Sequence, residues 1–376
     1  MRKLLKTVLF CLITVSVLCS FASADEPELS AHGVMLYCAD TGDTLYEKNA
    51  DEKMLIASTT KMMTAIVVIE NCELDERVEI MPEYCGIEGS SMYLAPGQSY
   101  TVRELLLGMM LVSGNDAATA LAYHTAGSIE DFADMMNGKA KALGLVNTAY
   151  KNPHGLDELG HFSTARDLAV LAAYCMQNED FASVVSTKSC TVNELTYVNH
   201  NKLLWNCEGC IGVKTGYTKA SGRSLVSCCE RDGMRLICVT LGAPDDWNDH
   251  EKLYELGFGK YRLTRIGRDN FKAEFDVISG IKNRAGAVPA RDIVLLTLPS
   301  DVVKTELYMP KMIFAGFLEG EKTGEIRVFV NGELAASEDL VYTENVETDR
   351  TQRLTTRERI QRLFDVNAKP YYISET

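Results

Sequence analysis

The stretch IASTTKMMTAIVVIE, residues 56–70, places a lysine three positions after a serine at the head of an otherwise apolar segment. Between residues 62 and 69 only Thr64 is polar, so a helix here would be apolar nearly all round and central to its domain. A helix that starts at Ser58 brings Ser58 and Lys61 to one side of its first turn. The stretch therefore predicts a lysine inside a core, within reach of a serine hydroxyl.

Burial changes the chemistry of such a lysine. Loss of hydration lowers the pKa of an amine by up to about 3 to 5 when burial is complete, and a neutral amine can take the proton of a nearby serine hydroxyl. Unpaired N–H groups at the helix start favour negative charge at Ser58, including the oxyanion of an acyl-transfer intermediate. The alternative is that Ser58 caps the helix and Lys61 reaches the surface. A lone SxxK motif favours that alternative, because matches this short are common by chance.

Two downstream motifs reverse that judgement. LVSGNDAATALA places Ser113-Gly114-Asn115 in a tight connection that can aim a hydroxyl and an amide into a cleft. GVKTGYT places Lys214-Thr215-Gly216 on a strand, where Gly216 would let a substrate backbone approach closely. These triplets begin 55 and 156 residues after Ser58, and in this order the three motifs resemble the signature of penicillin-recognising serine enzymes.

The expected elements build an α/β (α+β) domain around these motifs. Residues 33–49 read as a hairpin, and helical patterns run from about 58 to 177. Helix starts are expected at Thr101, in a capping box with Glu104, at Ser128, and at Ser163 or Thr164. Strand-like runs return at residues 209–218, 224–229 and 235–243. From this order alone we expect one mixed sheet, closed by both ends of the domain and covered by helices.

A small all-β C-terminal domain is expected at residues 271–346, after a catalytic domain at residues 25–270. Alternating runs there are broken by prolines and by Asn331-Gly332. The segment contains no histidine and no cysteine, which favours a spacer or docking role over a catalytic one.

The two ends of the chain carry different signals. Residues 1–24 combine three basic residues, an apolar core and the small-residue site Ala22-Ser23-Ala24, the pattern of a secretory signal peptide. Cleavage after Ala24 is favoured over retention as an anchor, because the apolar core is too short for an ordinary membrane span. We therefore expect an exported protein of the cell envelope. The tail, residues 347–376, is slightly basic and weakly amphipathic, so peripheral membrane contact and a solvated terminus both fit it.

The net charge and the cysteine content limit which binding partners and bound metals are expected. Without the leader the chain has 35 basic and 52 acidic residues, a net charge of −17 that argues against nucleic acid. Ten cysteines remain, which export would allow to pair. Cys207-Glu208-Gly209-Cys210 has the CxxC form of redox and zinc sites but lacks a second CxxC to complete a four-ligand set. Cys228, Cys229 and Cys238 lie in apolar runs typical of free buried thiols.

The sequence resembles the low-molecular-weight D-alanyl-D-alanine carboxypeptidases of the S11 peptidase family, penicillin-binding proteins that trim bacterial peptidoglycan. The resemblance spans residues 33 to 258 through DTGDTLYEKNA, ASTTKMMTA, GSSMYLAPGQ, SGNDAATALA, NPHGLD and GVKTGYT, and the β module resembles the family's second domain more loosely. It implies an antiparallel sheet flanked by helices. It also implies removal of the terminal D-alanine from pentapeptide stems through an acyl-enzyme, inhibition by β-lactams, and no metal or organic cofactor.

Carried over to this sequence, the resemblance assigns the catalytic roles. Ser58 would be the acylated nucleophile, Lys61 its base and Ser113 a proton relay. The backbone N–H groups of Ser58 and Tyr217 would form the oxyanion hole.

The resemblance also assigns substrate binding. Asn115 would bond the peptide, Lys214 would raise the local positive potential, and Thr215 would help to hold the terminal carboxylate. Gly216 and Tyr217 complete this substrate-binding set.

The positions at which this sequence differs from the family pattern concern substrate recognition more than the catalytic reaction. Ile56 stands where members commonly have proline, and Tyr217 stands where some have histidine. Arginines that assist carboxylate binding in some members are not evident near His200 and Asp246, and Arg223 is a candidate substitute because it follows the KTG strand.

Several other functions stay open from the sequence. A DD-endopeptidase would use the same residues. A serine β-lactamase shares the three motifs, but no E-x-x-L-N stretch for its deacylating glutamate occurs between Ser113 and Lys214. A catalytically silent cell-wall binding protein would have little need of the whole set. A Ser-His-Asp triad through His154 lacks the expected nucleophile elbow.

Overall fold

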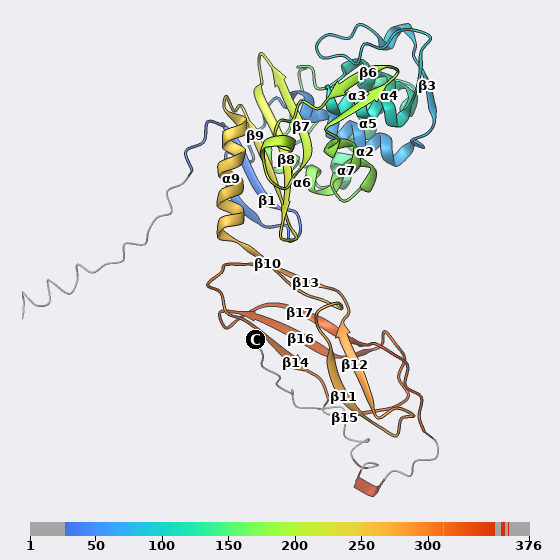
Figure 1. Cartoon of the computed structure of the whole chain (residues 1–376), viewed down its shortest axis with the longest axis vertical. Coiled ribbons are helices and arrows are strands. Elements are labelled where there is room, and N and C mark those ends of the chain that lie inside the picture. The colour runs from blue at the N-terminus through green and yellow to red at the C-terminus, as the bar shows by residue number, and fades with distance from the viewer. Residues whose placement is uncertain (1–26, 311, 350–354, 358–359, 361–376) are drawn as a thin grey trace, which may run out of the picture.

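The computed structural model describes residues 27–310, 312–349, 355–357 and 360. The predicted signal peptide, residues 1–24, lies outside them, and so does most of the predicted tail. The described chain forms an N-terminal α/β part and a C-terminal part made of strands, joined after one long helix, α9 (Figure 1). None of the helices in this described portion is long and apolar enough to cross a membrane.

Five strands of the N-terminal part form one sheet in the order β2-β1-β9-β8-β7. They are β1 (Gly33–Cys38), β2 (Thr44–Lys48), β7 (Cys210–Thr218), β8 (Gly222–Arg231) and β9 (Met234–Leu241). The expected closure by both ends of the domain is confirmed, because β1 pairs with β9. The expectation of a mixed sheet is wrong. All four pairings are antiparallel, because three are hairpins and β1 runs against β9. The sheet therefore agrees with the family resemblance, and β7 is an edge strand.

The sheet is covered on both faces, and side-chain alternation along its strands divides the core. Met35 and Val239 belong to the hydrophobic cluster shared with the helices of one face. Leu36 and Cys238, their neighbours in sequence, belong to a second cluster with Leu253 of helix α9 (Asp246–Lys260). The sheet thus carries a bundle on one side and a single helix on the other (Figure 1).

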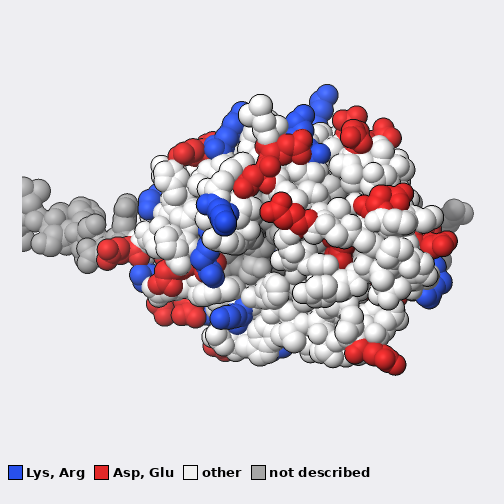
Figure 2. All heavy atoms as spheres, turned by 90° about the horizontal axis from the view of Figure 1, so that it is seen from above, with Lys and Arg blue, Asp and Glu red and all other residues white. Residues whose placement is uncertain are grey.

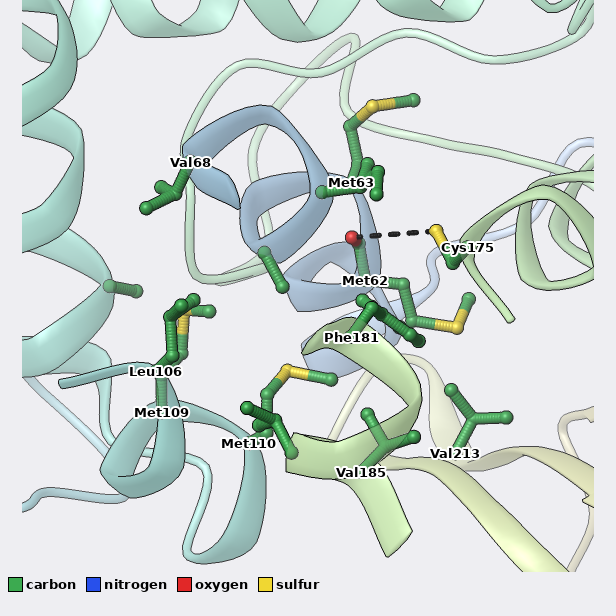
Figure 3. Close-up of a cluster of buried hydrophobic side chains, with 14 of the residues drawn as sticks. Met62, Met63, Val68, Leu106, Met109, Met110, Cys175, Phe181, Val185 and Val213 are labelled. Atoms are coloured by element: carbon green, nitrogen blue, oxygen red, sulfur yellow. Dashed lines mark hydrogen bonds between the residues drawn. The ribbon is translucent and has the colours of Figure 1, made fainter. Parts of the chain in front are cut away.

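Helix α2 (Lys61–Asn71) is the centre of the bundle, as its apolar sequence predicts. Its first eight residues are all buried. Around it pack α3 (Val102–Leu111), α4 (Asn115–Ala126), α5 (Ile129–Ala142), α6 (Ala165–Cys175) and α7 (Glu179–Ser186). Met62, Met63 and Met110 fill the spaces between these helices, and the Cys175 thiol points to the Met62 carbonyl at 3.9 Å (Figure 3). Flexible thioether side chains suit such irregular gaps.

The helix starts follow the sequence, with one exception. The capping box of Thr101 and Glu104 is confirmed, Ser128 caps α5, and Thr164 caps α6. The exception is Ser58, which lies in a 3-10 turn, η1 (Ala57–Thr60), and makes no side-chain cap; the α-helix itself begins at Lys61. Ser58 is therefore free of the structural role that the sequence left open for it.

Short elements complete the N-terminal part. There are two two-stranded sheets: β3 (Arg77–Glu79) pairs with β4 (Ser99–Thr101), and β5 (Ser189–Val192) pairs with β6 (Leu195–Val198). The two short helices are η2 (Pro82–Tyr84) and α8 (Leu203–Asn206). The hairpin of β5 and β6 packs on α3, whereas α8 lies beside the edge strand β7 and precedes it directly in the chain.

The C-terminal part is built from strands. Strand β10 (Arg262–Ile266) leaves α9 and pairs with β13 (Ile293–Thr297). The six-stranded sheet has the order β14-β16-β17-β12-β11-β15, from β11 (Ala273–Ile278), β12 (Arg284–Pro289), β14 (Val303–Tyr308), β15 (Met312–Phe314), β16 (Lys322–Val330) and β17 (Glu333–Tyr342). Phe317 stacks on Tyr342 in its core. Arg265 of β10 pairs with Asp40 between β1 and β2, which ties the two parts together.

Candidate active site

The turn η1 carries the serine into a strained position. Ala57 has a φ of 46°, a left-handed conformation that costs a residue with a side chain about 1 kcal/mol. Ile56, fully buried, anchors the turn, and its carbonyl accepts the Thr59 hydroxyl at 2.7 Å. Side chains three apart eclipse in 3-10 geometry, so Lys61 lies directly beside Ser58, with Nζ 2.9 Å from Oγ.

Lys61 is completely buried and has three polar neighbours. Its Nζ lies 2.7 Å from Asn115 Oδ1, 2.7 Å from the His154 carbonyl and 2.9 Å from Ser58 Oγ. Desolvation first, and then the charge of Lys214, lower the pKa of Lys61 well below its usual value, against the opposing charge of Asp116. A neutral amine has two hydrogens and one lone pair. In that neutral form the Asn115 amide and the His154 carbonyl would accept the two hydrogens, which would leave the lone pair for the Ser58 hydroxyl.

The SGN triplet forms the second wall of the site. Ser113, 5% exposed with a φ of 63°, lies in the middle of the three-residue connection between α3 and α4. Asn115 opens α4, and its amide group spans the site: Oδ1 accepts from Lys61 while Nδ2 donates to the Glu88 carbonyl at 2.5 Å. A Cβ at Gly89 would lie 2.9 Å from that Nδ2, so Asn115 needs a glycine there.

Asp116, which the sequence motifs did not single out, holds the adjoining loop. Its buried carboxylate accepts from Ser91 Oγ at 2.7 Å and from the backbone N–H groups of Met92 at 2.8 Å and Leu94 at 3.0 Å. A carboxylate that receives three such bonds fixes the loop that also supplies Ser90 to the cleft.

Strand β7 forms the third wall. Lys214 is 1% exposed, donates to the Thr215 carbonyl at 2.9 Å, and has its pKa lowered to about 7 by desolvation. The expectation for Gly216 needs correction. A Cβ there would lie 3.2 Å from the Ile56 carbonyl oxygen and the Ser58 nitrogen. The missing side chain therefore lets β7 approach the η1 turn, rather than making room for a substrate.

The NPHGLD segment supports the η1 turn from below. The Thr64 hydroxyl donates to the Pro153 carbonyl at 2.6 Å, and the His154 carbonyl accepts from Lys61. Gly155 has a φ of +88°, and a Cβ there would lie only 1.9 Å from the Ala57 carbonyl oxygen. Desolvation lowers the pKa of the His154 ring to about 3. His154 thus contributes its backbone, and the Ser-His-Asp alternative has no geometric support.

A single cleft joins these walls. Its volume is about 860 Å³, and among its lining residues are Ser58, Ser113, Thr215, Gly216 and Tyr217. All eight residues expected from the sequence therefore lie in this cleft or directly beneath it. Seen from above, this end of the molecule has a hollow with lysine and arginine side chains gathered on one side (Figure 2).

The far side of the cleft was not foreseen from the motifs. Strand β6, the connection after it, α8 and the start of α9 contribute Thr196, Val198, His200, Lys202, Trp205 and Trp247. Both tryptophans of the chain thus line the cleft, which the rarity of tryptophan in the sequence could have signalled.

Arg223 also lines the cleft, beside the KTG strand. It is the register partner of Tyr217 across β7 and β8. Its Nε and Nη2 lie 3.0 and 2.6 Å from Asp246 Oδ1, and its guanidinium lies 5.5 Å from the centre of the Trp247 ring. Asp246 and Trp247 thereby hold a cation at the mouth of the site.

The donor set around Ser58, an amine and hydroxyl and amide groups, is that of an acyl-transfer site. Within the described ranges, no three His, Cys, Asp or Glu side chains are grouped so that they could hold a metal ion.

Comparison with known proteins identifies a protein family that matches this chain. The profile of the D-alanyl-D-alanine carboxypeptidases, peptidase family S11, matches residues 20–245. The chain is 32% identical over 369 residues to D-alanyl-D-alanine carboxypeptidase DacF of Bacillus subtilis, covering 92% of this chain and 95% of the relative. It is 35% identical over 348 residues to DacC of Escherichia coli, covering 86% of each.

Solved structures agree in fold. Penicillin-binding protein 5 from Haemophilus influenzae matches 86% of this chain and 99% of its own, with 29% identity and a TM-score of 0.70. The Streptomyces K15 DD-transpeptidase matches 62% of this chain and 99% of its own, with 36% identity and a TM-score of 0.60.

Proposed function

This chain belongs to the D-alanyl-D-alanine carboxypeptidases of peptidase family S11, and from that membership we propose which of its residues perform the reaction. It is a serine-type carboxypeptidase that acts on peptidoglycan stem peptides and is inhibited by penicillins. The observation that carries the residue assignment is the completely buried Lys61, whose Nζ lies 2.9 Å from Ser58 Oγ at the floor of the cleft.

Acylation follows from that contact. Lys61 takes the hydroxyl proton while Ser58 Oγ attacks the carbonyl carbon of the penultimate D-alanine. The backbone N–H groups of Ser58 and Tyr217 stabilise the resulting oxyanion. The proton then passes from Lys61, with Ser113 as relay, to the leaving amine, and the C–N bond breaks to release D-alanine. Water hydrolyses the ester at Ser58 and regenerates the free serine.

Recognition of the substrate's terminal carboxylate is the step in which this chain would differ from other members of the family. Lys214 supplies positive charge from beneath the strand, Thr215 supplies a hydroxyl, and Arg223 faces the same cleft from the neighbouring strand. We assign to Arg223 the carboxylate contact that the family's other arginines make, because Asp246 and Trp247 hold its guanidinium at the mouth of the cleft. The peptide would lie along β7, the strand at the edge of the sheet in the described part of the chain, as an added strand.

Location, domains and membrane contact complete the proposal. The leader and the substrate, which lies outside the cytoplasm, support export to the cell envelope. Residues 25–270 would be the catalytic domain, residues 271–346 a spacer or docking domain, and the tail after residue 346 a peripheral membrane contact. Sedimentation with anionic vesicles tests the last point: the full chain should bind them, and a chain that ends at residue 346 should not.

One assay tests the residue assignment against the alternatives. Purified protein is incubated with a peptide ending in D-Ala-D-Ala, with a cross-linked peptide dimer and with a penicillin. Ser58→Ala should abolish D-alanine release, whereas Ser183→Ala, at an exposed serine on α7, should not. Release that persists in Ser58→Ala would refute the assignment. Cleavage of the dimer alone would indicate an endopeptidase. Rapid hydrolysis of the penicillin would indicate a β-lactamase, and no reaction with any of the three compounds would indicate a catalytically silent binding protein.

A further inference from the structure

Three cysteines, Cys207, Cys210 and Cys229, meet on the α9 side of the sheet and form what we call the thiol cluster. Cys207 Sγ lies 3.6 Å from Cys229 Sγ. Cys210 is the register partner of Cys229 across β7 and β8, and its Sγ donates to the Gly212 carbonyl at 3.4 Å. No disulfide joins the cysteines in the part of the chain that the structure describes. The reaction proposed above uses none of these three residues.

The surroundings distinguish one of the three thiols. Cys207 is partly exposed and receives Arg231 Nη2 at 3.6 Å, while Arg231 Nε donates to the Glu208 carbonyl at 3.0 Å and fixes the loop. Hydrogen bonding from Cys229 and the charge of Arg231 lower the pKa of Cys207 to about 7, against desolvation. Cys229 is fully buried, and its two thiol neighbours raise its pKa. The cluster thus pairs a partly exposed thiol of lowered pKa with a buried thiol, the arrangement of an attacking and a resolving cysteine.

We propose that the thiol cluster is a site of reversible oxidation, in which Cys207 reacts with a low-molecular-weight disulfide and Cys229 resolves the product into a Cys207–Cys229 disulfide. The Cys207 thiolate attacks the small disulfide, breaks its S–S bond and expels one thiolate, leaving a mixed disulfide. Cys229 gives up its proton to solvent and attacks Cys207 Sγ, which expels the second small thiolate, and the two expelled thiolates take up protons from solvent. Two protein thiols are oxidised, one small disulfide is reduced, and two small thiols carry away the protons.

The disulfide would fix one wall of the cleft. Cys207 directly follows α8, which carries Trp205 at the cleft, and β7 begins at Cys210. A Cys207–Cys229 bond closes a loop of about 20 residues that contains the KTG strand, and such a loop restricts the unfolded chain. The oxidised protein should therefore unfold several degrees higher than the reduced protein. This inference does not depend on the proposed peptidase function.

The test uses oxidised glutathione with the full chain, first fully reduced, at pH 7 without oxygen. Acid quenching, alkylation and peptide mass mapping should find Cys207 joined to Cys229. Iodoacetamide should label Cys207 at least tenfold faster than Cys190, a partly buried cysteine whose pKa is raised by desolvation. Cys229→Ser should stop at glutathionylated Cys207 and lose the rise in unfolding temperature, whereas Cys190→Ser should behave like wild type.

Circular dichroism checks that each variant is folded. The proposal is overturned if Cys207 and Cys229 both remain free after oxidation, if Cys207 is labelled no faster than Cys190, or if the disulfide joins Cys210 to either partner.

Discussion

At the scale of single residues, the chemistry depends on one amine kept out of water. Lys61 has no exposed surface, and in its neutral form the Asn115 amide and the His154 carbonyl would accept its two hydrogens, leaving the lone pair for Ser58. Burial does more than any nearby charge to lower its pKa, and Lys214 adds repulsion. The same burial lowers the pKa of Lys214 to about 7, so one desolvated pocket tunes two amines for different tasks.

The first prediction concerns the pH dependence of acylation by penicillin. Acylation should fall as pH decreases through the lowered pKa of Lys61, because the protonated amine cannot accept a proton. Lys61→Met should slow acylation by about 10²- to 10⁴-fold. Lys214→Met removes the neighbouring positive charge, so the pKa of Lys61 should rise and the acidic limb of the profile should move to higher pH. An unmoved limb in Lys214→Met would contradict the coupling of the two lysines.

The second prediction concerns Gly155. An alanine there must take a φ of +88° and place its Cβ against the Ala57 carbonyl, so Gly155→Ala should displace the η1 turn and reduce acylation at least tenfold. Gly144→Ala is the matched control. Gly144 has a φ of +72° with open space around it, so this variant carries the backbone strain without the collision. Equal acylation rates in the two variants, measured with a fluorescent penicillin, would show that the contact with Ala57 is unimportant.

At the scale of elements, a buried polar network joins α9 to the sheet. His250 Nδ1 lies 2.6 Å from Ser227 Oγ and His250 Nε2 lies 2.9 Å from Thr240 Oγ1, while Tyr254 also contacts Ser227 at 2.6 Å. These bonds fix the helix against β8 and β9. Because α9 begins with Asp246 and Trp247, the network also fixes the residues that hold Arg223 at the cleft.

The third prediction follows from desolvation, which lowers the pKa of His250 to about 3. In the unfolded chain a histidine has a pKa of about 6.5. Below that value the unfolded state binds a proton that the folded state refuses, so stability falls as pH decreases from about 6.5 toward 3. Between pH 7 and pH 5 His250 should account for a loss of about 2 kcal/mol.

Denaturant unfolding at the two pH values measures that loss. His250→Gln keeps hydrogen-bonding groups but cannot titrate, so its stability should decline by about 2 kcal/mol less than that of wild type. An identical decline in both proteins would show that His250 does not carry the effect.

At the scale of the whole molecule, the cleft belongs entirely to the N-terminal part. Every cleft-lining residue precedes β10, and the β6 hairpin that lines the cleft lies at the end away from the strand-built part (Figure 1). The K15 transpeptidase, which matches 62% of this chain and 99% of its own, corresponds in length to that part alone.

The fourth prediction is that a chain ending at Lys260 folds and reacts. It loses β10 together with its partner β13, so no unpaired strand is left. It also loses the Arg265–Asp40 ion pair, which is partly exposed and contributes less than about 1 kcal/mol. The acylation rate constant should stay within about twofold of the full chain. Loss of acylation in a truncated chain with a native circular dichroism spectrum would mean that the C-terminal part shapes the cleft.

The sequence predicted the groups that carry chemistry, because SxxK, SGN and KTG each place several functional groups within three or four residues. It also predicted that strands from both ends of the N-terminal part share one sheet and that α2 is buried, because the pattern of apolar residues indicates which segments are buried. It could not predict contacts between distant residues, such as the His154 carbonyl on Lys61, 93 positions apart. Every residue has a backbone carbonyl, so the residue type does not show which carbonyl accepts a hydrogen bond. The contacts of Gly216 and Gly155 with the turn η1 likewise become visible only in the folded structure.

The most direct test of the central assignment is the intact mass of the protein after brief incubation with penicillin, followed by peptide mapping. Wild type should gain the mass of one penicillin, located on the peptide that contains Ser58, and Ser58→Ala should gain none. A penicillin adduct on any other residue of the wild type, or an adduct that persists in Ser58→Ala, would contradict the account.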